Sequence, residues 1–368
     1  MSRARTWAKN GLLLGAAVCC ALVLTEVLVR LVAPQPTGLS HQDRYGLPLH
    51  YPGITRYLPQ YGHEVSFNSV GMRDREHSSG AAEGTYRVLL LGDSFMEALQ
   101  VPFDSTMAAL LEGTLQARSG KPVEVINAGV SGWGTDDELR YLTSYGLAYK
   151  PSLVVVAMTL HNDVSDNLRL SWHKMVDGAL VEQVREPIPF LQYKELQAKA
   201  FVATRLQIYQ LWRRVRHGGE IRQVGRRLNS HLLSLFAKES PAEIRDGVAL
   251  TGLLLERMQA VAGAVGAPVV LVLLPIRYQL SEAEFADFAA GYGASTESLS
   301  IVQPQSMMTA TAASLGLPVI DLLPAFQGWT AEGRGPLYLE WDGHWNAAGH
   351  KLAADVVASG LLREGRLP

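Results

Sequence analysis

Short apolar runs that alternate with longer, helix-like segments dominate the sequence from residue 86 onward. Most of these runs are built almost entirely from Val, Leu, Ile, Met and Ala, which is typical of strands buried on both faces. Such strands need helices on both sides, and a parallel sheet with helical crossovers provides them. The expected strands are 88–91, 123–126, 153–158, 268–274 and 318–322, and the main expected helices are 106–118, 136–149 and 347–361. We therefore predict an α/β fold, a three-layer flavodoxin-like sandwich with a central, mostly parallel five-stranded sheet.

Residues suited to chemistry follow the first three of these strands. Ser94 comes directly after the first strand, within Gly92-Asp93-Ser94. A glycine-rich stretch containing Gly132 follows the second strand, and Asn162 follows the third. Parallel α/β sheets bind ligands at the carboxyl ends of their strands, so we expect these residues to meet at one edge. Gly, Asp and Ser are also turn residues, and the first stretch alone fits a plain turn as well as a nucleophile.

Asp342 and His344, just before the last expected helix, supply the partners that a nucleophilic serine needs. A serine hydroxyl requires a base, histidine suits that task near neutral pH, and a carboxylate holds its tautomer. Residues two apart in an extended segment point to the same side. One alternative is an ordinary loop in which Asn346 caps the helix. Another is a metal site of Asp342, His344 and His350, although a spacing of six places the two histidines on different faces of a helix.

Donors for an oxyanion are expected at the same edge. The backbone N–H groups of Ser94 and Gly132 and the side-chain amide of Asn162 are the candidates, and such donors are each worth roughly a hundred- to thousand-fold in rate. A nucleophile, a base, an orienting acid and three donors together predict acyl transfer from serine.

Four sequence blocks in this order resemble those of the SGNH hydrolases, also called GDSL-type esterases. The blocks are Gly92-Asp93-Ser94, residues 127–132, Asn162-Asp163 and Asp342-Gly343-His344, and the resemblance extends over roughly residues 86–361. It implies that Ser94 is the nucleophile, that Asp342 and His344 complete the triad, and that Gly132 and Asn162 bind the oxyanion. It implies no metal or organic cofactor.

The chain departs from the common pattern at two places within these blocks. His161 precedes Asn162, where many members have glycine, which could alter the donor loop. One residue separates Asp342 from His344, where many members have two. The shorter spacing is similar to that of membrane-associated and polysaccharide-modifying members, including alginate acetyltransferase-like proteins.

The N-terminus has the pattern of a membrane anchor. Three basic residues precede an uncharged run over 11–25, and continuation to Ala33 brings a helix to roughly 34 Å, enough to span a bilayer. Glu26 and Arg30 are spaced to pair with each other near the outer end. The basic residues favour a cytoplasmic N-terminus and an extracytoplasmic domain, periplasmic or extracellular. A cleaved signal peptide is the alternative. Cys19 and Cys20, the only cysteines, lie inside the apolar run.

The expected organisation has three parts. Residues 1–33 form the cytoplasmic N-terminus and the anchor, 34–84 a linker and irregular segment, and 85–368 the SGNH hydrolase-like domain. A helical insertion at about 164–266, with helices at 195–216, 220–237 and 241–265, interrupts this domain. Its basic residues fit either a solvated helix face or a contact with anionic lipid headgroups or an acidic polymer. These residues are Arg213, Arg214, Arg216, Arg222, Arg226 and Arg227.

Composition limits the functional classes. The formal net charge of −2 offers no basic excess for nucleic acid. The first hypothesis is a membrane-anchored serine esterase acting on an acyl ester of a surface carbohydrate or lipid. The second is an O-acyltransferase that uses the same triad to acylate a cell-envelope polysaccharide. The third is a non-catalytic envelope assembly factor that keeps the scaffold.

Overall fold

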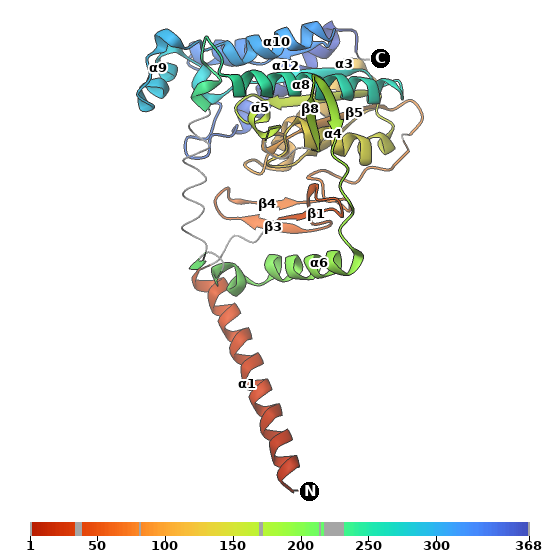
Figure 1. Ribbon diagram of the computed structural model, residues 1–368, viewed down its shortest axis with the longest axis vertical. Helices are drawn as coiled ribbons and strands as arrows, with labels where there is room; N and C mark the ends of the chain where they lie inside the picture. Colours follow the sequence, from red (N-terminus) through yellow and green to blue (C-terminus); the bar gives the residue numbers. More distant parts are fainter. Residues whose placement is uncertain are drawn as a thin grey trace.

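A five-stranded parallel sheet forms the centre of the protein (Figure 1). The computed structural model describes residues 2–33, 39–80, 82–168, 172–212, 215–216 and 232–366. The strands lie in the order β11-β10-β7-β5-β6, and every pair is parallel. Their bounds are β5 (Tyr86–Gly92), β6 (Val123–Gly129), β7 (Leu153–Thr159), β10 (Val269–Leu274) and β11 (Val319–Asp321). This is the flavodoxin-like order, which confirms the predicted fold class.

Helices cover both faces of the sheet, because successive residues of each strand point to opposite sides. On β5, Val88 and Leu90 pack into one core, and Leu89 and Leu91 pack into the other. The first core is closed by α3 (Met107–Ser119), α11 (Leu323–Ala331) and α12 (Ala347–Arg363). The second is closed by α4 (Thr135–Ser144), α8 (Ala242–Gly263), α9 (Glu282–Gly291) and α10 (Gln303–Ser314). Short helices lie at α2 (Ser94–Glu97), α5 (Asp163–Asp166), η1 (Phe103–Ser105), η2 (Gly146–Tyr149), η3 (Arg277–Gln279) and η4 (Thr296–Ser298).

The segment between β7 and β10 differs from the expected helical insertion. It contains an antiparallel hairpin of β8 (His173–Val176) and β9 (Ala179–Glu182). Its last helix, α8, is the crossover helix of the sheet, since Leu254, Leu255 and Met258 are fully buried in the core. Sequence periodicity could not separate this crossover helix from inserted ones.

The remaining predicted helices of that segment are only partly described. The prediction of a helix over 195–216 corresponds to α6 (Phe190–Arg205), which ends at the extended residue Leu206 before helical residues resume at 207. Most of the predicted helix 220–237 lies outside the described residues, as do Arg213, Arg214, Arg222, Arg226 and Arg227.

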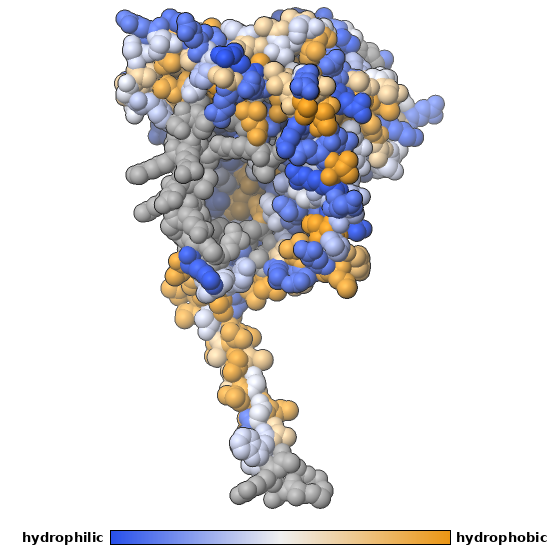
Figure 2. All heavy atoms as spheres, in the orientation of Figure 1, coloured by the Kyte–Doolittle hydropathy of each residue, from blue (hydrophilic) through white to orange (hydrophobic). Residues whose placement is uncertain are grey.

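The N-terminal helix α1 (Ser2–Val32) leaves the body of the protein and exposes most of its apolar side chains (Figures 1 and 2). Its stretch Thr6–Val32 is long and apolar enough to cross a membrane, a property that a signal sequence shares. The expected pair forms, with Arg30 Nε donating to Glu26 Oε1 over 2.8 Å.

The prediction of irregular structure over 34–84 is wrong at residues 40–50 and 55–66. Two antiparallel hairpins form there. Sequence periodicity does not indicate them, because their short, half-exposed strands show no clear alternation of apolar and polar residues. They are β1 (Ser40–Gln42) with β2 (Pro48–His50), and β3 (Thr55–Leu58) with β4 (His63–Ser66).

Small residues at the carboxyl ends of the central strands let α2 lie directly against the sheet. Gly92 is in register with Gly129 on one side and Ala157 on the other. A Cβ added to Gly129 would lie 2.5 Å from the Met96 Cβ and 2.6 Å from the Glu97 nitrogen. The residue that begins α2, Ser94, is thereby held at the end of β5.

We expect Gly129→Ala to lower the free energy of unfolding by about 1–3 kcal/mol, because α2 has to move away from β6. The matched control is Gly113→Ala, on the exposed side of α3, where an added Cβ meets no atom within 4 Å. That substitution should stabilise the protein by about 0.5–1 kcal/mol. Urea unfolding of the two variants measures both effects, and an unchanged midpoint for Gly129→Ala would contradict the packing argument.

Candidate active site

Asp93 fixes the turn in which Ser94 lies. Its Oδ1 accepts hydrogen bonds from the Phe95 nitrogen and from Thr159 Oγ1, both over 2.9 Å, and so caps α2. Its Oδ2 accepts a bond from Asn162 Nδ2 over 3.3 Å. The side chain is buried, and this burial raises the pKa of Asp93. Asp93 therefore joins the ends of β5 and β7 to the segment that carries Asn162.

The structure brings Ser94, His344 and Asp342 into one chain of hydrogen bonds. Ser94 Oγ lies 2.8 Å from His344 Nε2, and His344 Nδ1 lies 2.7 Å from Asp342 Oδ1. All three residues are half-buried, and the Phe95 ring packs against the imidazole at 4.8 Å between centroids. The arrangement has the geometry of a nucleophile, a base and an orienting carboxylate.

The loop that carries Asp342 and His344 is fixed at both ends. Tyr338 and Trp345 form a β-bridge across it, and Leu339 N donates to the His344 carbonyl over 2.8 Å. Asn346 caps α12, as the ordinary-loop interpretation expected, through bonds from the Ala348 and Gly349 nitrogens. The capped helix and the Asp342–His344 pair therefore occur together.

Tyr61 belongs to the candidate site although no sequence pattern indicates it. It lies between β3 and β4, and its hydroxyl donates to Asp342 Oδ2 over 2.8 Å. Its ring stacks on Trp341 at 5.4 Å between centroids. Burial and the contact with Asp342 raise the pKa of Tyr61 to about 12, so it is a hydroxyl donor at neutral pH. Both oxygens of Asp342 are engaged, one by His344 and the other by Tyr61.

Gly132 lies in the turn after β6, at the edge of the sheet where Ser94 is found. Its φ of +83° is a conformation that favours glycine. The turn is tied to the end of β5 by a bond from Val130 N to the Gly92 carbonyl, over 3.1 Å. Within the described part of the chain, the backbone N–H groups of Ser94 and Gly132 donate no hydrogen bond. Asn162 reaches the same region and directs its amide nitrogen to Asp93.

A buried carboxylate behind the site holds the Gly132 turn in place, and no sequence pattern indicates it. Glu97 Oε2 accepts bonds from Ser131 N, over 2.7 Å, and from Ser131 Oγ. Its Oε1 lies 3.0 Å from His50 Nε2, and both side chains are buried. Although burial acts to raise the pKa of Glu97, His50 and Ser131 lower it overall. Glu97 is therefore an ionised anchor that connects β2, α2 and the turn after β6.

His161 and His350 have different surroundings. His161 lies beside the Phe95 ring, 6.2 Å away between centroids, and burial together with His344 lowers the pKa of His161 to about 4. His350 is buried under α3, where Nδ1 accepts a bond from Met107 N over 3.3 Å. Burial lowers the pKa of His350 to about 3. Among the described residues, no three His, Cys, Asp or Glu side chains are grouped as metal ligands.

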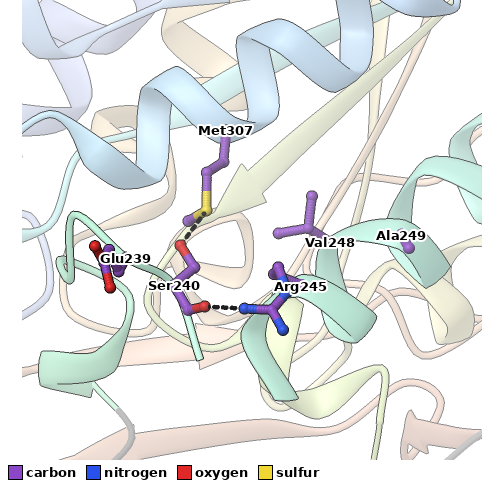
Figure 3. Close-up of a pocket in the computed structure, with 6 residues that line it drawn as sticks. All are labelled: Glu239, Ser240, Arg245, Val248, Ala249 and Met307. Atoms are coloured by element: carbon purple, nitrogen blue, oxygen red, sulfur yellow. Dashed lines mark hydrogen bonds between the residues drawn. The ribbon is translucent and has the colours of Figure 1, made fainter. Parts of the chain in front are cut away.

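Two cavities differ in what they offer for chemistry. One of about 330 Å³ opens beside Asp342 and His344, and Arg277 and Glu340 also line it. A larger one of about 640 Å³ lies between the start of α8 and Met307 of α10 (Figure 3). There Ser240 Oγ donates to the Met307 sulfur, and none of the predicted catalytic residues lines the space. The smaller cavity is the candidate substrate site, because Asp342 and His344 line it and His344 contacts Ser94.

The fold and the four blocks are similar to those of SGNH hydrolase-like domains. A family model described as "SGNH hydrolase-like domain, acetyltransferase AlgX" matches residues 237–367, which include Asp342 and His344. This match confirms the resemblance seen in the sequence. No curated protein sequence matches the chain.

Solved structures with a similar fold are distant in sequence. LAE5, an alpha/beta hydrolase from the metagenome of Lake Arreo, Spain, is 17% identical, with a TM-score of 0.42 over 77% of this chain and 96% of its own. The acetyl xylan esterase AlAXEase is 14% identical, with a TM-score of 0.41 over 75% and 99%. Axe2, an acetylxylan esterase from Geobacillus stearothermophilus, is 17% identical, with a TM-score of 0.40 over 76% and 93%.

We expect Tyr61→Phe to slow the reaction of Ser94 with a fluorophosphonate probe roughly tenfold, because Asp342 loses one hydrogen bond of about 1.5 kcal/mol. The matched control is Tyr57→Phe, since Tyr57 is exposed on β3. Labelling rates over a range of pH measure the effect, and a change in the pH profile would show that Tyr61 acts through the Asp342–His344 pair. A labelling rate equal to that of the control would show that Tyr61 does not contribute to the reactivity of Ser94.

Proposed function

We propose that the protein is a serine esterase that hydrolyses acyl esters. The observation that carries the proposal is the hydrogen-bonded chain from Ser94 through His344 to Asp342. Ser94 Oγ attacks the ester carbonyl carbon while His344 Nε2 takes the hydroxyl proton. Asp342 stabilises the imidazolium that forms. The N–H groups of Ser94 and Gly132 and the Asn162 amide hold the oxyanion.

The second half of the reaction uses the same groups in reverse. Collapse of the tetrahedral intermediate breaks the ester C–O bond, and the alcohol leaves with the proton from His344. Water then attacks the acyl-Ser94 carbonyl as His344 accepts a proton from it, and collapse releases the acid and restores the serine. These steps require no metal or organic cofactor.

A surface carbohydrate is the substrate class that the surroundings of the triad favour over a lipid. Trp341 is 63% exposed next to Asp342 and is supported from behind by the Tyr61 ring. A rigid aromatic side chain with one open face offers a flat apolar surface to a sugar ring.

In this proposal α1 anchors the protein in the membrane. The N-terminus lies in the cytoplasm and the catalytic domain lies outside the cytoplasm, because the basic residues precede the span.

We expect Ser94→Ala to lower kcat/KM for a short-chain aryl ester by roughly 10⁴-fold or more and to abolish fluorophosphonate labelling. The matched control, Ser119→Ala at the end of α3, should retain both. Thermal unfolding monitored by circular dichroism checks that the variants fold. Full activity in the Ser94 variant would refute the mechanism. Absence of both turnover and labelling in the wild type would favour the non-catalytic assembly factor.

An O-acyltransferase is the second candidate, favoured by the match to a family model described as an acetyltransferase. The triad serves both reactions, because a sugar hydroxyl can replace water in the second half. The one-residue spacing of Asp342 and His344 is also in line with polysaccharide-modifying relatives.

The two candidates differ in where the acyl group goes. With an aryl acetate as donor and envelope polysaccharides present, we expect one acetate released per phenol and no new acetyl groups on the glycan. Mass spectrometry of the glycan and an acetate assay measure the partition, with Ser94→Ala as the blank. Glycan acetylation accompanied by a deficit of free acetate would instead establish transfer.

A further inference from the structure

The outer end of α1 is attached to α6, a helix that lies across the base of the body (Figure 1). Arg30 Nη2 donates to the Arg205 carbonyl, at the last residue of α6, over 2.7 Å. The Glu26 carboxylate accepts bonds from the Gln207 and Ile208 nitrogens, each over 3.0 Å. These bonds therefore fix the position of α6 along the axis of α1.

The two sides of α6 have different surroundings. One side turns toward β1, where Tyr193, Gln197 and Ala200 line a small cavity together with His41 and Asp43. The other side, which we call the α6 outer face, carries exposed apolar side chains. They are Phe190 (59% exposed), Leu191 (81%), Phe201 (55%) and Val202 (40%).

Two cations accompany these apolar groups on the α6 outer face. Lys194 Nζ lies 5.5 Å from the centroid of the Phe190 ring, and the Arg205 guanidinium lies 3.8 Å from that of Phe201. The helix as a whole carries three basic residues and one acidic residue. Aromatic and aliphatic groups with long cationic side chains above them suit the boundary between headgroups and acyl chains, where phosphates are near.

The length of α1 places α6 at that boundary. About 20 residues of helix cross the roughly 30 Å hydrocarbon core. Lys9 is charged and is expected at the inner membrane surface. A span of this length that begins at Lys9 ends close to Arg30, the residue that binds α6. Apolar surface continues from α1 to the base of the body in Figure 2.

From this geometry we propose that the α6 outer face lies in the headgroup region of the membrane that α1 crosses, and that it binds an anionic lipid surface. The inference rests on the anchoring role proposed for α1 and is independent of the esterase activity. A single spanning helix leaves the attached domain free to tilt, whereas a second contact through α6 restrains its orientation.

Depth-dependent fluorescence of the full chain in phosphatidylglycerol–phosphatidylcholine liposomes tests the proposal. In a Cys19→Ser, Cys20→Ser background, one cysteine replaces Phe201 and carries an environment-sensitive dye. The matched control is Val265→Cys. Val265 is 51% exposed and follows α8, a helix that lies at the end of the body opposite α1 (Figure 1). We expect spin-labelled headgroup lipids to quench the dye at 201 at least threefold more than the dye at 265. Equal quenching would overturn the proposal.

Two further measurements separate its parts. A dye on Cys19 in a Cys20→Ser variant reports whether α1 is inserted in the bilayer. If the dye at Cys19 is in the bilayer and the dye at 201 is not, the result contradicts membrane binding by α6 and still supports α1 as an anchor. Lys194→Gln should weaken quenching at 201 about twofold in anionic liposomes, whereas Lys199→Gln, which removes a lysine paired with Glu195, should not. A dye at 201 that is equally shielded in detergent would indicate a protein contact and refute lipid binding.

Discussion

The buried carboxyl group of Asp93 connects three segments that are distant in the sequence. It caps α2 through Phe95, receives the Thr159 hydroxyl at the end of β7, and receives the Asn162 amide beyond it. Because the sheet places β5 next to β7, these groups meet where the strand order reverses, the position at which parallel α/β sheets bind ligands. The serine that follows Asp93 is thus oriented by the sheet as much as by its own turn.

The segment before the sheet completes the site from the other side. Tyr61 binds Asp342, His50 lies against Glu97, and Arg73 donates to the Glu97 carbonyl at the end of α2. Burial lowers the pKa of Arg73 to about 10, and a guanidinium there remains charged at neutral pH. A cation at the carboxyl end of a helix is favourable, even for one turn. Through these contacts Tyr61, His50 and Arg73 become part of the scaffold of the candidate site.

The sheet and the hydrogen-bonded chain of Ser94, His344 and Asp342 can be predicted from the sequence because both leave local patterns in it. Uninterrupted apolar runs indicate buried parallel strands, and residues that follow them must lie at one edge. Tyr61 and Glu97 show no such pattern. Tyr61 contacts Asp342, which is 281 residues away in the sequence, and the sequence around Glu97 is that of an ordinary helix. The hairpins β1–β2, β3–β4 and β8–β9 were missed because their strands are three or four residues long and carry mixed polarity. The sequence alone does not separate α8 from an inserted helix, because only packing against the sheet distinguishes a crossover helix.

Glu26 and Arg30 show how a local rule can be right and still incomplete. Their spacing predicts a pair, which forms, and a pair lowers the cost of charges near the end of an apolar helix. The structure adds that Arg30 binds the carboxyl end of α6 while Glu26 accepts bonds from the first nitrogens of the following helical segment. Each charge therefore complements the helix end of opposite partial charge. The same two residues that make α1 imperfect as an apolar span hold it to the domain.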